Sequence, residues 1–379
     1  MTTDALRPDR RLFLAAGASL AMAGPASARV ADPGDYEAHL DLAFSRAGPP
    51  ALAGMVVGRS GASWIGVRGV RRLGAPEPVT VDDRWHVGSN TKAMTAALFA
   101  RAVQSGATAW DLPLARAFPD LTVHPRWAAA TLDDLMRHRA GLMDASVMGQ
   151  SWLMTARSDP RSLVEQRTAI AAAALGAPPA GNPGAFAYGN ANYVLAGAAL
   201  ERITGRPWEE QMAADLFQPL GLASAGFGAP ADPAPWGHGS RGGVSTPIPP
   251  GPFGDNPAAL GPAGTAHMSM ADYGRFLAVW LDGGRGWLTG ASLARLTTPF
   301  AGPGAAYGYG WGVLSHPLGG RDRRPGPLLT HDGSNTYWYL SAALLPERGL
   351  AVVAASNDAG RGSQAVGDLI QRLLRAAAG

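Results

Sequence analysis

Residues 87–94 read VGSNTKAM, with Ser89 three positions before Lys92, and the prediction of the fold depends on this stretch. Lys92 is the only lysine in the chain, although the sequence holds 32 Lys and Arg residues together. A surface cation functions equally well as arginine, whereas a lysine amine, unlike a guanidinium, can lose its proton when it is buried. The single lysine therefore indicates a residue that takes part in proton transfer.

The residues after Ser89 predict a buried helix that begins at this motif. The run 93–99 is nearly all apolar, as in a helix inside a core. Side chains three positions apart lie on one helical face, so the Lys92 amine can reach the Ser89 hydroxyl. A hydroxyl is a weak nucleophile unless an adjacent base takes its proton. The spacing thus favours a nucleophile and its base; the alternative is a helix-capping serine and a surface lysine.

Two further polar segments follow this motif in the chain. Residues 187–197 read AYGNANYVLAG, and residues 328–338 read LLTHDGSNTYW. The order Ser-x-x-Lys, Tyr-x-Asn and His-x-Gly resembles the serine β-lactamases and penicillin-binding proteins. The Tyr-x-Asn form is similar to that of the class C β-lactamase branch, which also holds esterases and D-amino-acid peptidases.

The connecting segments extend the resemblance over most of residues 35–375. They read TLDDLMRHRAGL at 131–142, ERITGRPWEEQM at 201–212, GPAGTAHMSMADYGRFL at 261–277 and LPERGLAVVAASND at 345–358. One departure concerns activity: the Lys-Thr-Gly triplet of true β-lactamases reads His331-Asp332-Gly333. A second is the loss of the usual hydroxyl residue around 139–142. Antibiotic hydrolysis is therefore not implied.

The resemblance implies a role for each site residue. Ser89 would form an acyl-enzyme, Lys92 would be the leading base, and Tyr188 would share the proton relay. Burial must then lower the lysine pKa by about 3 units from its reference value. The backbone N–H groups of Ser89 and Ser334 would form the oxyanion hole. The implied substrate-binding residues are Asn190, His331, Gly333 and Ser334.

A purely structural role is the alternative for several of these residues. Tyr188 could be a packed core aromatic, Asn190 a helix cap and His331 a strand-end histidine. His138, beside two arginines at the end of a predicted helix, is interpreted as a contact at that helix end rather than a ligand. No His spacing typical of a metal site occurs, so no metal or cofactor is predicted.

The pattern along the chain predicts an α+β fold of the β-lactamase/transpeptidase type. Strand-like runs at 52–59, 63–70, 328–330, 337–345 and 350–356 predict one antiparallel sheet built from both chain ends. Helices are predicted at 36–46, 94–103, 132–137, 162–175, 193–204, 270–281 and 363–378. Residues 29–379 would form a single catalytic domain, with its sheet part at 35–104 and 303–379 and its mainly helical part at 105–302.

The N-terminal segment resembles a twin-arginine export signal over residues 1–28. Arg10 and Arg11 precede an apolar run at 12–23, too short to span a bilayer, and Ala26-Ser27-Ala28 predicts cleavage after Ala28. The product would be periplasmic or secreted, and the absence of cysteine excludes a lipid-anchoring thiol and disulfides. Scattered arginines and a charged fraction of 16% argue against nucleic acid as a partner.

These observations predict a periplasmic serine hydrolase that cleaves an ester or amide through a Ser89 acyl-enzyme. The expected partner is a small-molecule or peptide substrate: a short ester, a D-amino-acid peptide or a β-lactam-like compound. The alternative is a penicillin-binding-type sensor or scavenger that is acylated without efficient turnover. No stable membrane anchor is expected, and the oligomeric state stays open.

Overall fold

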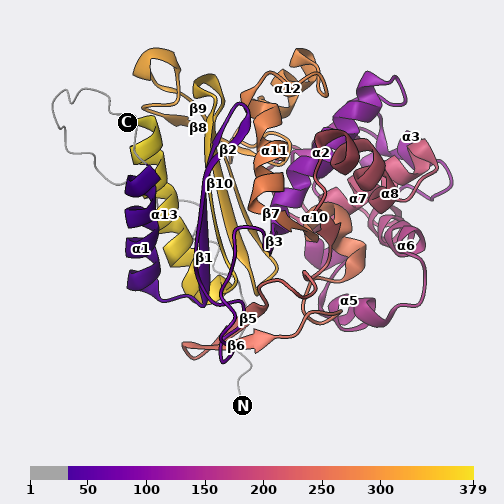
Figure 1. Ribbon diagram of the computed structural model, residues 1–379. Helices are drawn as coiled ribbons and strands as arrows, with labels where there is room; N and C mark the ends of the chain where they lie inside the picture. Colours follow the sequence, from indigo (N-terminus) through magenta and orange to yellow (C-terminus); the bar gives the residue numbers. More distant parts are fainter. Residues whose placement is uncertain (1–32) are drawn as a thin grey trace. The chain divides into compact units, whose positions relative to one another are not determined.

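The computed structural model describes residues 33–379, so the export signal predicted at 1–28 lies outside the described residues. The described chain confirms the predicted α+β fold. A six-stranded sheet stands between a pair of helices on one face and a larger helical region on the other (Figure 1).

The central sheet joins the two ends of the described chain. Its strand order is β2-β1-β11-β10-β9-β8, and its neighbouring strands are antiparallel. β1 (Ala51–Gly58) pairs with β11 (Leu350–Ser356), so both chain ends share one antiparallel sheet, as predicted. The remaining strands are β2 (Gly61–Gly69), β8 (Gly312–His316), β9 (Gly326–Ser334) and β10 (Tyr339–Leu345).

Two strands differ from the prediction. β9 extends beyond the predicted 328–330, so His331, Gly333 and Ser334 lie on the strand rather than after it. Its polar residues interrupt the apolar pattern, yet His331 still pairs with Ala342 of β10. β8 was not predicted: it is an edge strand with several exposed residues, including Leu314, and therefore lacks clear alternation.

Helices α1 (Pro33–Ala47) and α13 (Ala359–Ala378) cover one face of the sheet (Figure 1). Leu40 of α1 and Leu369 of α13 are fully buried in the core between this layer and the sheet. α13 begins four residues before the predicted position, because the Asp358 side chain accepts hydrogen bonds from the first free N–H groups of the helix.

On the other face of the sheet α11 (Met270–Leu281) packs against β1 and β2, and α2 (Thr91–Gln104) and α7 (Asn190–Thr204) lie beyond it (Figure 1). The buried apolar residues of α2 belong to the main core, as its apolar sequence predicts. The other helices here are α3 (Leu114–Ala117), α4 (Leu132–Met136), α5 (Gln150–Thr155), α6 (Leu163–Gly176), α8 (Trp208–Gln211), α9 (Gln218–Leu220), α10 (Gly261–Gly264) and α12 (Gly290–Thr297).

The middle region also contains strands, which its mainly helical pattern did not predict. β7 (Ala266–Ser269) pairs with β3 (Arg84–His86) and with β4 (Gly226–Phe227). β5 (Gly237–Arg241) and β6 (Val244–Ile248) form a separate hairpin. These strands are short and contain polar residues or glycine, so their alternation is weak.

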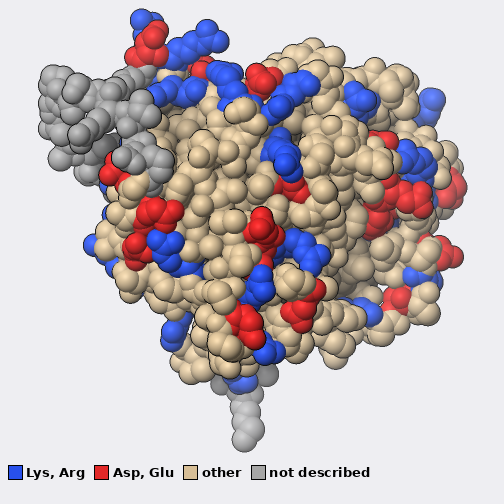
Figure 2. All heavy atoms as spheres, in the orientation of Figure 1, with Lys and Arg blue, Asp and Glu red and all other residues tan. Residues whose placement is uncertain are grey.

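The described surface matches the even charge distribution of the sequence. Figure 2 shows basic and acidic side chains interspersed on the face it presents, without a large region of one sign. Among the described helices, none has both the length and the apolar character needed to cross a membrane.

Candidate active site

Ser89 lies in a short 3₁₀ turn, η1 (Gly88–Asn90), directly before α2. The backbone of this turn touches β9. A Cβ atom at Gly88 would lie 2.4 Å from the Ser334 nitrogen, and one at Gly333 would lie 2.1 Å from the Val87 oxygen and 2.9 Å from the Ser89 nitrogen. Gly88 also has φ +53°, which favours glycine. The two glycines therefore bring together the backbone segments that carry the Ser89 and Ser334 N–H groups.

The Lys92 side chain is fully buried, and its amine faces three oxygen atoms. Nζ lies 3.1 Å from Ser89 Oγ, 2.8 Å from Asn190 Oδ1 and 2.8 Å from the Ala263 carbonyl oxygen. A neutral amine has two N–H donors and one lone pair. The Asn190 and Ala263 oxygens can accept both N–H groups, which leaves the lone pair for the Ser89 hydroxyl proton.

Burial lowers the pKa of Lys92 to about 7, because the charged amine loses its hydration. The carboxylate of Asp144 opposes this effect and favours the protonated amine. A substantial fraction of Lys92 is therefore neutral near pH 7. This agrees with the shift that the sequence analysis required of a base.

Tyr188 contacts both residues of the predicted pair. Its hydroxyl is hydrogen-bonded to the Ser89 side chain, and its ring centroid lies 4.9 Å from Lys92 Nζ. The residue is 38% exposed, so its outer edge faces solvent. Burial of the hydroxyl raises the pKa of Tyr188 above its ordinary value, while the hydrogen bond with Ser89 opposes that rise. Tyr188 is therefore a neutral phenol at physiological pH, not a phenolate.

Asn190 is the first residue of α7, which begins three residues before the predicted position 193. The extra turn is capped by Asp144, whose carboxylate accepts hydrogen bonds from the N–H groups of Asn190 at 2.9 Å and Ala191 at 2.7 Å. Sequence reasoning missed Asp144. It lies 46 residues before Asn190, and local spacing carries no signal of such a distant cap.

His331 is buried on β9, with its Nδ1 atom 2.6 Å from the Gly310 carbonyl oxygen. The carbonyl can only accept, so Nδ1 carries the proton and Nε2 has the lone pair. Burial, followed by the charge of Lys92, lowers the pKa of His331 to about 3. His331 is therefore uncharged at neutral pH. Its ring centroid lies 6.3 Å from that of Tyr188.

His138 lies deeper in the site than the sequence indicated. It follows α4, but its ring packs 4.5 Å from the Tyr188 ring instead of only closing the helix end. Its Nδ1 atom accepts a hydrogen bond of 3.3 Å from the Gly189 N–H. Burial lowers the pKa of His138 well below its ordinary value, so it is a neutral support for the Tyr188 segment. Further rings of this cluster belong to Phe186, Tyr193 and Tyr307.

The segments at residues 146–157 and 248–262 contact each other. The Arg157 guanidinium donates hydrogen bonds to the carbonyl oxygens of Pro252 and Asp255. A cleft of about 560 Å³ lies here, with Asp255 and Asn256 among its lining residues. Within residues 33–379, no group of three or more acidic or histidine side chains is arranged to hold a metal ion.

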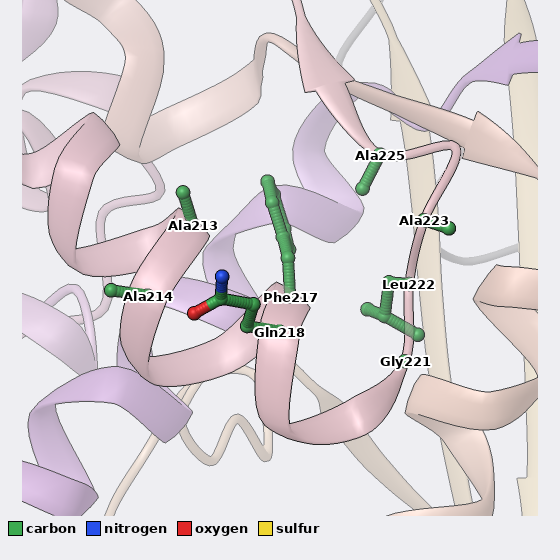
Figure 3. A pocket seen from close by; sticks show the side chains of 8 residues that line it. All are labelled: Ala213, Ala214, Phe217, Gln218, Gly221, Leu222, Ala223 and Ala225. Atoms are coloured by element: carbon green, nitrogen blue, oxygen red, sulfur yellow. The ribbon is translucent and has the colours of Figure 1, made fainter.

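A second hollow of about 420 Å³ lies between the π-helical turn at Met212–Phe217 and the segment 221–225 (Figure 3). Half of its lining residues are alanines, the others include Phe217 and Leu222, and none is a predicted site residue. It offers no nucleophile and no titratable side chain for catalysis.

The sequence is similar to those of known proteins, in one case over most of its length. Penicillin-binding protein 4 of Amycolatopsis lactamdurans is 27% identical over 328 residues, which cover 82% of this chain and 81% of that protein. An unguisins hydrolase of Aspergillus violaceofuscus is 26% identical over 197 residues, which cover 50% of this chain and 34% of that protein.

Solved structures show the same fold. The octameric penicillin-binding protein homologue from Pyrococcus abyssi has a TM-score of 0.73 at 22% identity, covering 90% of this chain and 77% of that one. A D-stereospecific amidohydrolase from Streptomyces sp. has a TM-score of 0.68 at 23% identity, covering 88% and 97%. Residues 21–377 match the model of the Beta-lactamase family. The chain therefore belongs to the Beta-lactamase family.

Proposed function

We propose that this member of the Beta-lactamase family is an exported serine hydrolase that cleaves an ester or amide through an acyl-enzyme on Ser89. The observation that carries the proposal is the surroundings of Lys92. Two fixed oxygens accept the N–H groups of its neutral amine, and its third neighbour is the Ser89 hydroxyl. A relative named as a hydrolase supports the reaction class.

Acylation begins when Ser89 Oγ attacks the substrate carbonyl carbon and Lys92 takes the hydroxyl proton. The resulting ammonium is stabilised by the Asn190 and Ala263 oxygens and by the Tyr188 ring. The developing oxyanion is bound by the N–H groups of Ser89 and Ser334. The tetrahedral intermediate collapses when the leaving group departs with the proton from Lys92, passed on by the Tyr188 hydroxyl.

Deacylation repeats these steps with water in place of Ser89. Water attacks the acyl carbon, its proton passes through Tyr188 to Lys92, and Ser89 recovers a proton as the acid product leaves. Tyr188 acts here as a protonated relay, because its raised pKa argues against a phenolate at neutral pH.

The substrate side of the site favours a neutral ligand. A β-lactam carries a carboxylate, and the Lys-Thr of true β-lactamases would supply it with a cation. Here His331 is uncharged and the adjacent Asp332 is an exposed acid. A short ester lacks the carboxylate and loses nothing. We therefore expect short esters to be better substrates than β-lactams, with D-amino-acid amides as the second class to test.

The test uses a panel of p-nitrophenyl esters, D-amino-acid amides and a chromogenic cephalosporin on the purified chain. We expect repeated turnover, with kcat/KM for p-nitrophenyl acetate above that for the cephalosporin. A higher cephalosporin value would contradict the proposed preference. A single burst of product without turnover would support the acylated sensor or scavenger instead. A fluorophosphonate probe, mapped by mass spectrometry, should label Ser89.

A further inference from the structure

Asp255, on the loop that follows β6, connects three parts of the chain through one oxygen atom. Its Oδ1 lies 2.9 Å from His86 Nε2, 2.8 Å from Asn335 Nδ2 and 2.7 Å from the N–H nitrogen of Asn256. The side chains of Asp255, His86 and Asn335 are all nearly fully buried. A buried carboxylate is costly unless it is paired and hydrogen-bonded, so this arrangement calls for an explanation.

The first arm runs through His86 to the turn that carries the nucleophile. His86 Nδ1 accepts a hydrogen bond of 3.1 Å from the Gly88 N–H, the peptide group next to that of Ser89. In the neutral ring the proton is then on Nε2, which lies 2.9 Å from Asp255 Oδ1 as an electrostatic contact without the geometry of a hydrogen bond. The negative charge of Asp255 attracts the Nε2 proton and so favours this tautomer, and His86 holds the start of η1 through its hydrogen bond with the Gly88 N–H.

The second arm runs through Asn335 to the end of β9. Asn335 directly follows Ser334, and its Oδ1 accepts hydrogen bonds of 3.1 Å from the N–H groups of Tyr337 and Trp338. The amide thereby closes the turn in which Thr336 has φ +80°. The arms also pack on each other, since the His86 ring stacks on Trp338 with centroids 5.7 Å apart.

We propose that Asp255 is a positioning residue that sets the spacing between the two oxyanion donors, the N–H groups of Ser89 and Ser334. This inference rests on the proposed function. Donors stabilise a developing charge most when they are fixed in advance, and a misplacement of about 1 Å can cost ~10²-fold in rate. Asp255 acts through His86 and Asn335.

The test compares Asp255→Asn and Asp255→Ala with Asp358→Asn, which alters a buried carboxylate at the start of α13. With p-nitrophenyl acetate, we expect both Asp255 variants to lower kcat by roughly 10- to 100-fold and to change KM less than about twofold. Fluorophosphonate labelling of Ser89 should slow by a similar factor, because its phosphoryl oxygen uses the same donors. Asp358→Asn should lower Tm and leave kcat and the labelling rate unchanged.

The results distinguish a failure of the positioning role of Asp255 from a failure of the proposed Ser89 acyl-enzyme. Labelling of wild-type Ser89 together with wild-type rates in Asp255→Asn would overturn the positioning role alone. A wild-type chain that is not labelled at Ser89 would overturn both. If Asp255→Ala does not fold, Asn335→Ala removes one arm and keeps the carboxylate, and a wild-type kcat in that variant would also overturn the inference.

Discussion

Lys92 is the residue on which most of the chemistry depends, and Lys92→Arg tests it directly. Arginine keeps the charge but stays protonated, so it cannot accept the Ser89 proton. We expect kcat/KM for p-nitrophenyl acetate to fall by ~10² to 10⁴, the usual contribution of a general base. Fluorophosphonate labelling should fall with it. Wild-type labelling by a variant with an unchanged Tm would remove Lys92 from the mechanism.

The same residue sets the expected pH dependence. The base must be neutral, and burial lowers the pKa of Lys92 to about 7, so the reactive fraction increases as pH rises through that value. We therefore expect kcat/KM to rise with pH, to reach half its maximum near 7 and to level off above 8. Initial rates in buffers of constant ionic strength from pH 5 to 9 measure this curve. A rate that falls as pH rises through 7 would contradict neutral Lys92 as the base.

At the scale of elements, α7 depends on a cap from a distant loop. Asp144→Ala removes the acceptor of the Asn190 and Ala191 N–H groups, and loss of a cap costs about 1 kcal/mol. We expect a lower Tm and roughly tenfold lower kcat/KM, because Asn190 also accepts from Lys92. Ser162→Ala, which removes the cap of α6, is the matched control and should lower only stability. Equal activity in both variants would show that the α7 cap has no effect on the site.

The elements also show where sequence reasoning succeeds. β1 and β11 carry apolar runs bounded by turn residues, and α2 is apolar on nearly every side, so their types were predicted correctly. The three motifs likewise placed Ser89, Lys92 and Tyr188 in one site, because their order in the chain resembles a known family. In the structure Lys92 Nζ lies 3.1 Å from Ser89 Oγ, and the Tyr188 hydroxyl is hydrogen-bonded to the Ser89 side chain, so the three side chains lie together.

The parts that were missed depend on contacts between distant segments. Asp144, His138 and Asp255 each act on a peptide group or side chain far away in the sequence, so their local patterns carry no signal. The strand β8 has no apolar alternation to identify it, and the extended end of β9 is polar because it faces the site. Such contacts and strands can be identified only from the three-dimensional structure.

At the scale of the whole molecule, the segment at residues 1–28 predicts export. If Arg10 and Arg11 are read as a twin-arginine signal, replacing both by Lys should leave folded, active enzyme in the cytoplasm. Activity in periplasmic and cytoplasmic fractions measures the outcome, and Arg7→Lys in the same segment is the control. Unchanged periplasmic activity in the double variant would indicate a different route.

The pairing of β1 with β11 constrains the order of folding. Leu52 lies opposite Ser356, so the centre of the sheet closes only after about three hundred intervening residues have left the ribosome. Until then the edge of β1 that will pair with β11 is bare, and another chain can bind it. Closing so long a loop is entropically costly, and contacts this distant in sequence slow folding. The oxyanion hole, whose second donor comes from β9, is therefore among the last features to form, and nascent chains stay inactive until the sheet is complete.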